Sequence, residues 1–141
     1  MRMITVLRSV ILSLGLLPFA GAALADGIEL PAKVRPGLGG QYVLRATLVT
    51  SNNVNGLQYA PFTVAADGRI GEEVPGFQLR PAKINTRAGE KRQVLVTFPA
   101  DQPFPSSRLA LCMWRQPDVP KSETSQMINA FRYCKLFAAE P

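Results

Sequence analysis

Two cysteines, Cys112 and Cys134, are the residues of this chain with the most sharply defined chemistry. Each lies in a run of β-prone, largely apolar residues, and a polar, proline-containing connection separates the two runs. This arrangement predicts a β-hairpin with a long loop. If the runs pair antiparallel, the cysteines can lie side by side and form a disulfide in an oxidising compartment. The alternative is a pair of buried free thiols that pack as small apolar residues.

The sequence contains no histidine. Ser-His-Asp and Cys-His nucleophilic machinery and imidazole metal ligands are therefore excluded, and two cysteines alone do not complete a tetrahedral zinc site. A phosphate-binding loop would have to open a helix, and no segment shows a helical period of apolar residues. The adjacent Glu72 and Glu73 would point apart. We therefore predict that the protein is not an enzyme and uses no metal or cofactor.

The first 25 residues predict a cleavable secretory signal peptide. Arg2 and Arg8 provide a basic start, residues 10–20 form an apolar core, and the segment 23–25 fits the small-x-small cleavage rule. The core is too short to span a bilayer, which disfavours the alternative of an uncleaved anchor. We expect cleavage after Ala25, leaving residues 26–141 as one domain. Export to an oxidising compartment would favour the disulfide over free thiols.

The positive charge of the chain is mild. The formal net charge is +6, and two of the cations belong to the signal peptide. This excess, together with export, argues against a nucleic-acid partner. One basic cluster is expected to be a solvated face, with an acidic partner or an anionic envelope surface as the alternative. Its members are Arg80, Lys83, Arg87, Lys91 and Arg92.

Apolar alternation at period two predicts an all-β fold. Residues 41–50 place Arg45 and Thr47 on one face and apolar side chains on the other, and residues 91–98 show a similar apolar face. The apolar members are Tyr42, Leu44, Ala46, Leu48, Val94, Val96 and Phe98. The further strands expected are 27–34, 57–65, two short pieces within 77–86, 108–114 and 127–137, with a loop at 71–76. About seven short strands, with turn signals roughly every ten residues, predict an immunoglobulin-like antiparallel β-sandwich.

The region 108–137 resembles the periplasmic chaperones that assemble pili by donor-strand complementation. The resemblance is carried by a Pro-Lys-Ser-Glu loop at 120–123, a Lys-Leu-Phe strand end at 135–137, and Pro141. Further matches in the middle of the chain are Pro81, Lys83, Ile84, the turn Ala88-Gly89, and Val94-Leu95-Val96. Ala88 stands where the family usually has proline. The resemblance covers most of residues 27–141 but only the first of the two domains of these chaperones.

The resemblance implies a binding site on the last strand. Lys135 matches a basic residue that anchors the C-terminal carboxylate of a pilus subunit, by a charge-assisted hydrogen bond. The second anchor, on the first strand, corresponds to Arg35 or Lys33. The donor set in family register is Ile128, Ala130 and Arg132, an alternation poor in large apolar residues. The alternative for Lys135 is an ordinary solvated strand lysine, of the kind that blocks edge aggregation.

Trp114 shares a strand face with Cys112, and a tryptophan beside a disulfide in a sandwich predicts core packing.

Taken as a whole, the resemblance implies a periplasmic chaperone-like protein that binds pilus or fimbrial subunits by β-strand addition at its last strand. It implies no stable membrane insertion, and it leaves room for a partner chain that supplies the second domain. The alternative is a structural or accessory sandwich protein of the cell envelope without a chaperone cycle.

Overall fold

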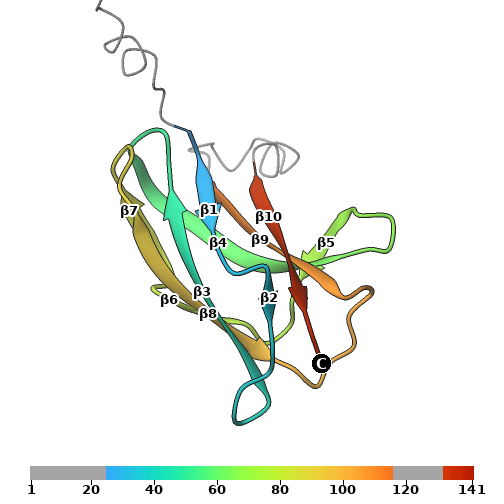
Figure 1. Ribbon diagram of the computed structural model, residues 1–141. Helices are drawn as coiled ribbons and strands as arrows, with labels where there is room; N and C mark the ends of the chain where they lie inside the picture. Colours follow the sequence, from blue (N-terminus) through green and yellow to red (C-terminus); the bar gives the residue numbers. More distant parts are fainter. Residues whose placement is uncertain (1–24, 116–131) are drawn as a thin grey trace, which may run out of the picture.

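The structure is a computed structural model that describes residues 25–115 and 132–141. Its ten strands form two facing sheets (Figure 1). The strands are β1 (Gly27–Glu29), β2 (Lys33–Val34), β3 (Gln41–Val49), β4 (Val54–Val64), β5 (Ile70–Glu73), β6 (Gln78–Arg80), β7 (Ile84–Thr86), β8 (Arg92–Pro99), β9 (Arg108–Arg115) and β10 (Tyr133–Ala139).

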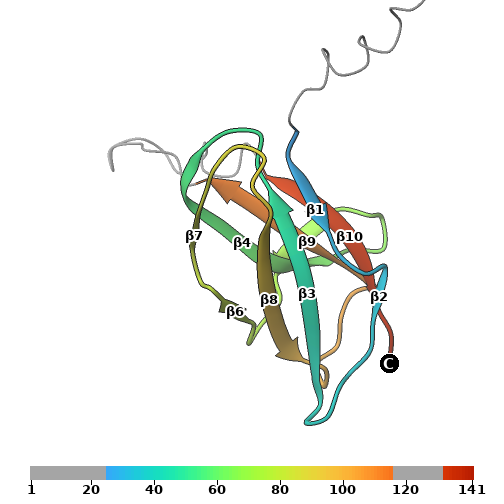
Figure 2. The same cartoon turned by 60° about the vertical axis from the view of Figure 1, so that its left-hand side comes forward.

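The strand order is that of an immunoglobulin-like sandwich. The first sheet runs β1-β3-β8-β6, and the second runs β2-β10-β9-β4-β5, with β7 also paired to β4. A four-stranded sheet facing a sheet centred on the third, sixth and seventh strands of the fold is the immunoglobulin arrangement. Figure 2, turned by 60°, shows β1, β3 and β8 in front of β9 and β4. The predicted fold class is therefore confirmed.

Alternating apolar side chains from both sheets meet between them and form the main core. β3 follows the pattern most regularly, because its inward residues are buried and its outward residues reach solvent. All seven apolar residues that the alternation of β3 and β8 singled out are buried. The second sheet contributes Leu109, Leu111, Met113 and Phe137. The buried Tyr59 belongs to the same core, and its hydroxyl donates a hydrogen bond to the carbonyl of Pro81.

The strand expected at 27–34 is two strands in different sheets. β1 pairs antiparallel with β3, whereas β2 pairs parallel with β10. Pro31 lies between them, and a proline cannot donate a ladder hydrogen bond, so the chain leaves one sheet there and joins the other. The parallel β2–β10 pair also departs from the purely antiparallel sandwich that the sequence predicts.

The loop expected at 71–76 is partly strand. β5 pairs with β4 through Ile70 and Glu73. Its residues are mostly polar and exposed, so the apolar alternation that reveals a half-buried strand is missing. Gly71 lies against Thr63 of β4, where an added Cβ would stand 2.5 Å from the threonine hydroxyl. Here glycine permits the close approach of two strands rather than marking a loop.

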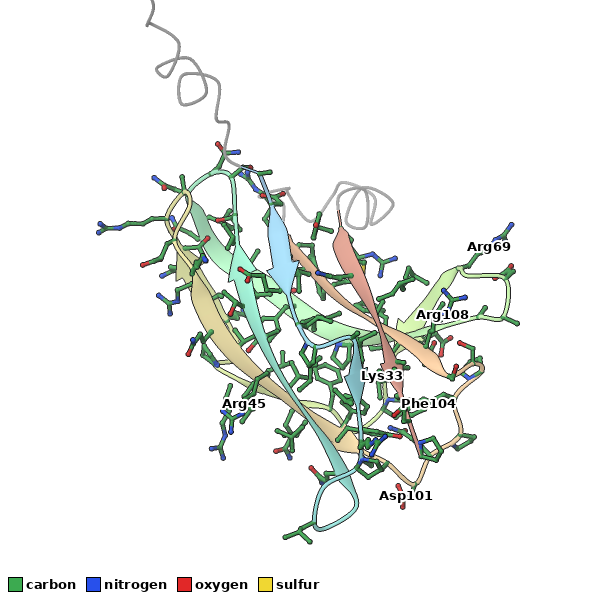
Figure 3. All side chains as sticks on the ribbon, viewed as in Figure 1. Lys33, Arg45, Arg69, Asp101, Phe104 and Arg108 are labelled. Atoms are coloured by element: carbon green, nitrogen blue, oxygen red, sulfur yellow. A yellow bond between two sulfur atoms is a disulfide. The ribbon has the colours of Figure 1, made fainter. Side chains whose placement is uncertain are left out.

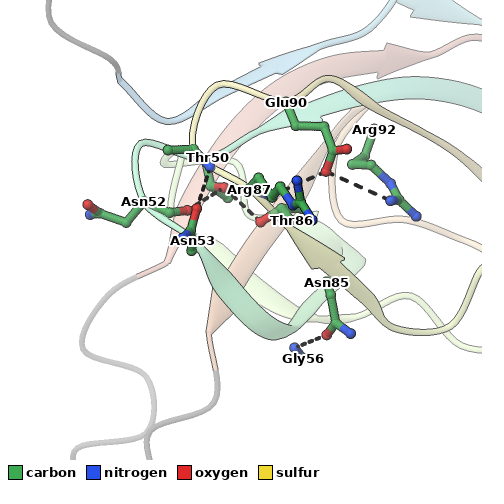
Figure 4. A network of polar contacts seen from close by, with 10 residues as sticks. Thr50, Asn52, Asn53, Gly56, Asn85, Thr86, Arg87, Glu90 and Arg92 are labelled. Atoms are coloured by element: carbon green, nitrogen blue, oxygen red, sulfur yellow. Dashed lines mark hydrogen bonds and ion pairs between the residues drawn. The ribbon is translucent and has the colours of Figure 1, made fainter.

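A polar network joins two turns at one end of the sandwich (Figure 4). The hydroxyls of Thr50 and Thr86 lie 2.7 Å apart and are both buried. Thr50 donates to the carbonyl of Asn52, so Thr86 is the donor between the two hydroxyls. The side-chain carbonyl of Asn53 accepts from the backbone N–H of Ala88 at 2.9 Å. These bonds hold the β3–β4 turn against the β7–β8 turn.

Candidate functional site

β10 is paired along its full length on one side and only at its end on the other. It pairs with β9 from Tyr133 to Ala138, but with β2 only at Ala138 and Ala139. The N–H of Ala138 donates to the carbonyl of Ala32, away from β9 (2.8 Å). By strand alternation, the N–H groups of Cys134 and Leu136 point the same way. Within residues 25–115 and 132–141, no strand pairs with that part of β10, so its backbone forms an open edge.

The predicted disulfide links β10 to its neighbour. Cys112 and Cys134 lie directly opposite each other in the β9–β10 ladder, with Cα atoms 4.0 Å apart. The interpretation as two free thiols is therefore replaced by a disulfide across adjacent strands. Because the bridge fastens the edge strand to the next strand, it fixes β10 in register without using the outward-facing backbone groups.

Lys135 lies on the face of β10 that is turned toward the other sheet. It stands opposite the buried Leu111 and two residues before the buried Phe137. Lys135 itself is exposed, as is Tyr133 on the same face. The side chains at this end of the strand therefore lie at the margin of the opening between the sheets, where a cation can meet an incoming chain.

Lys33 and Arg35 meet a carboxylate of the chain itself. Arg35 Nε donates to Glu140 Oε1 at 3.1 Å, and Lys33 Nζ lies 3.6 Å from Glu140 Oε2. The hydrogen bond from Arg35, assisted by the charge of Lys33, holds the pKa of Glu140 below its usual value. The carbonyl of Glu140 also accepts from the hydroxyl of Tyr42 at 2.8 Å. Glu140 thereby fastens the end of β10 to β2 and β3.

The three candidate anchors do not form one cluster. Val34 and Ala139 are buried, so the neighbouring Lys33 lies on the outer face of its sheet, whereas Lys135 lies on the inner face. Lys33 and Arg35 come together at Glu140, and Lys135 stands apart from them. Glu140 itself was not singled out in the sequence, because the parallel β2–β10 pairing that brings it to Lys33 is not visible there.

The donor residues Ile128 and Ala130 lie outside the described residues. Arg132 is half-buried, with its guanidinium carbon 4.8 Å from the centre of the Phe62 ring. Such a position is a cation–π contact on the outer face of the second sheet. Arg132 is thus already engaged with its own domain.

Trp114 packs against an apolar cluster that includes both cysteines, which bears out the expected packing beside the disulfide, although on the other side of the sheet from the main core. It meets Phe62 edge-on, with ring centroids 5.9 Å apart, in a second apolar cluster on the outer face of the sheet. The buried members of this cluster are Ala60, Phe62, Val64, Ala110 and Cys112. The signal was present in the sequence, because the run Leu-Ala-Leu-Cys-Met in β9 is apolar at every position, as in strands buried on both faces.

A cavity of about 350 Å³ opens beside the start of β10. Its apolar wall includes Leu57, Met113 and Tyr133, and its polar rim includes Arg115 and Arg132. In the part of the chain that the structure describes, no group of three or more metal-ligating side chains gathers. The cavity therefore offers an apolar side chain a place to bind, with cations nearby.

These observations define the class of the protein as an immunoglobulin-like sandwich with a half-open, disulfide-linked edge strand. Neither a protein-family model nor a curated protein sequence matches the chain. One similar solved structure is that of the periplasmic chaperone SfaE, at 13% identity and a TM-score of 0.39, covering 80% of this chain and 55% of that chain. Another is WR4, a C. elegans MSP family member, at 13% identity and a TM-score of 0.40, covering 84% of this chain and all of that chain. This chain thus spans about half the length of the SfaE structure.

The described residues form strands, turns and loops, and they include no helix with the length and apolar character that a membrane span needs.

Proposed function

We propose that the protein is an exported, chaperone-like sandwich that binds a pilus or fimbrial subunit by β-strand addition along β10. The observation that carries this proposal is the open backbone edge beside Cys134 and Leu136. An added strand gains main-chain hydrogen bonds there, and its alternate side chains meet the two faces of β10. The Lys-Leu-Phe sequence at 135–137 supports the choice of a pilus subunit, and the signal peptide predicted from the sequence of residues 1–25 supports a periplasmic location.

The side chains around the open edge suit a partner strand with apolar residues and a terminal carboxylate. Tyr133 and Leu136 are 40% and 42% exposed, on opposite faces of β10, and offer apolar contact on both. Lys135 is the anchor we assign, since its ammonium reaches solvent at the opening between the sheets. Lys33 and Arg35 already bind Glu140, so they would bind the partner's carboxylate only if that carboxylate displaced Glu140. In this proposal the protein is not an enzyme.

Proline substitution at Leu136 tests the edge directly. Leu136→Pro removes one outward N–H and leaves the hydrogen bonds to β9 in place, which edge positions tolerate. The matched control, Leu136→Ala, removes the side chain but keeps the N–H. Each variant is co-expressed in the periplasm with subunits encoded in the same operon, and stoichiometric co-purification is measured by intact mass spectrometry. We expect Leu136→Pro to lose capture and Leu136→Ala to keep most of it.

Equal capture by wild type and Leu136→Pro would show that the partner does not add to β10.

Lys135→Ala is expected to weaken capture about tenfold or more, because it removes a charge-assisted hydrogen bond. If Lys135→Ala captures subunits as well as wild type does, the anchoring role is wrong even where strand addition holds. Thermal unfolding of each variant tests whether the domain remains folded.

One observation favours an accessory or structural sandwich protein as the second candidate. Glu140 already forms ion pairs with both Lys33 and Arg35, so two of the three cations proposed as anchors are engaged within the chain. A protein of this kind would purify alone from the periplasm, even when the subunits are abundant.

A further inference from the structure

Two arginines flank one leucine on the outer face of the first sheet. Arg45 of β3 and Arg80 of β6 both stand opposite Leu95 of β8, which lies between them. The neighbours of Arg45 and Leu95 along their strands, Leu44 and Val96 among them, are buried inward, so Arg45 and Leu95 face outward. Figure 3 shows Arg45 projecting away from the sandwich. Since adjacent strands lie about 4.8 Å apart, the two arginine Cα atoms are roughly 10 Å apart, within joint reach of one small anion.

This pair has no acidic partner among the residues that the structure describes, whereas several other cations do. Lys91 pairs with Glu29 at 3.8 Å, and Arg92 pairs with Glu90 at 3.9 Å. Glu29 stands opposite Thr47, on the same face of the first sheet as Arg45. Its carboxylate is already paired with Lys91. The predicted basic cluster is thereby divided: Lys91 and Arg92 are paired, and Arg80 belongs with Arg45 instead.

The surface between the two arginines is hollowed. A shallow depression of about 310 Å³ is lined by both guanidinium-bearing side chains and by Thr47, Gln93 and Leu95. Thr47 and Gln93 lie opposite each other in the β3–β8 ladder and add uncharged donors beside Arg45. The site therefore combines two forked cations, neutral hydrogen-bond donors and one apolar contact.

We propose that Arg45 and Arg80 bind the phosphate of a monoester. Each guanidinium presents a planar fork of N–H donors, which matches two oxygens of a phosphate. A monoester has three terminal oxygens and a charge of about −1.5 to −2 at neutral pH, so it can satisfy two forks and two positive charges together. A single carboxylate carries one charge and two oxygens, which one arginine already satisfies.

The ester bears either a small soluble group or the glycerolipid of an envelope membrane, and the phosphate chemistry is the same in both. The site is on the sheet opposite β10. A protein held at a phosphate-bearing surface through Arg45 and Arg80 would keep its open edge strand free, so this inference stands independently of strand addition.

The test uses the purified, disulfide-intact protein and two probes. The first is glycerol 3-phosphate, titrated while the backbone amide signals of Thr47, Gln93 and Leu95 are followed by NMR. The second is phosphatidylcholine vesicles containing phosphatidic acid, a monoester headgroup, compared with vesicles of equal total charge containing phosphatidylglycerol, a diester. Binding to glycerol 3-phosphate identifies a soluble ester as a ligand, and binding to phosphatidic acid vesicles alone identifies the lipid headgroup.

The variant Arg45→Gln/Arg80→Gln is expected to weaken binding of the responding probe at least tenfold. Lys83→Gln/Arg87→Gln is the matched control, because it removes the same charge from exposed residues outside this face, and it should change binding less than threefold. Arg45→Lys/Arg80→Lys keeps the charge but loses the forks, and it should lose the preference for phosphatidic acid over phosphatidylglycerol. This variant also keeps the test decisive if the glutamine variant does not fold.

Two results would overturn the proposal. One is the absence of binding to both glycerol 3-phosphate and phosphatidic acid vesicles. The other is an equal loss of binding in the control variant, which would show attraction by the overall positive charge rather than a site at Arg45 and Arg80.

Discussion

Reduction of the Cys112–Cys134 disulfide should destabilise the domain by an amount that follows from its loop length. The two cysteines are separated by 22 residues in the sequence. In the chain-entropy model, removing a cross-link that closes a loop of this length lowers the free energy of unfolding by about 3.4 kcal/mol at 25 °C. For a domain of this size, such a loss lowers the melting temperature by roughly 10–15 °C. The paired β9–β10 ladder remains in the folded state, so the loss arises mainly from the greater freedom of the unfolded chain.

The measurement is urea unfolding of the oxidised protein and of the reduced, thiol-blocked protein, followed by the fluorescence of Trp114, the single tryptophan. Trp114 lies on β9 beside Phe62, so it reports on the sheet that the bridge joins. In the control Cys112→Ala/Cys134→Ala, added reductant should change nothing. A difference below about 1 kcal/mol between oxidised and reduced protein would refute the reasoning, because the hairpin would then be equally restricted without its bridge.

Three further predictions concern single side chains. Burial raises the pKa of Tyr59 to about 12. Since an unfolded tyrosine ionises near pH 10, the free energy of unfolding should fall as the pH rises from 10 to 12. Tyr59→Phe should abolish this fall, and the loss of the hydroxyl's hydrogen bond should lower the free energy of unfolding by about 1 kcal/mol at neutral pH. The Arg35 hydrogen bond lowers the pKa of Glu140, so its stabilising contribution is present above the ordinary carboxyl pKa and is lost as the pH falls through the lowered value; urea titrations between pH 5 and 2 should show a smaller loss in Glu140→Gln. Phe98→Ala should cost about 3–5 kcal/mol, because its ring is fully buried among other aromatic rings; the exposed Val43→Ala is the control, expected within about 0.5 kcal/mol of wild type in the same urea assay.

The sequence revealed the features that depend on local pattern. Alternation along β3 and β8 identified buried residues such as Leu44 and Val96, because strand side chains take opposite faces at period two. The two cysteines lay at matching places in neighbouring strands, so antiparallel pairing was enough to join them. The sheet change at Pro31 was harder to foresee, since the missing N–H shows that a ladder ends but not where the chain goes next.

The candidate site was only partly predictable, because it depends on which strands become neighbours. The sequence could not show that Lys33 and Lys135 occupy opposite faces of one sheet, since a shift of one residue in the β2–β10 register would reverse the relation. Likewise, Arg45 and Arg80 lie far apart in the chain, and they become neighbours only through their shared partner Leu95. Sequence pattern gives the face of each residue within its strand, whereas the pairing of strands is a property of the whole fold.

The parallel pairing of β2 with β10 has a mechanical consequence. These strands lie near the two ends of the folded domain and run in the same direction, so tension applied to the two termini pulls them past each other rather than apart. Two backbone hydrogen bonds join these strands, from the N–H of Ala138 to the carbonyl of Ala32 and from the N–H of Glu140 to the carbonyl of Val34. These hydrogen bonds and the ion pairs of Glu140 then carry the load at the same time. Bonds loaded together in shear resist more force than bonds opened one after another. Tension between the two termini therefore loads two short pairs near the ends of the domain, β1 with β3 and β2 with the end of β10.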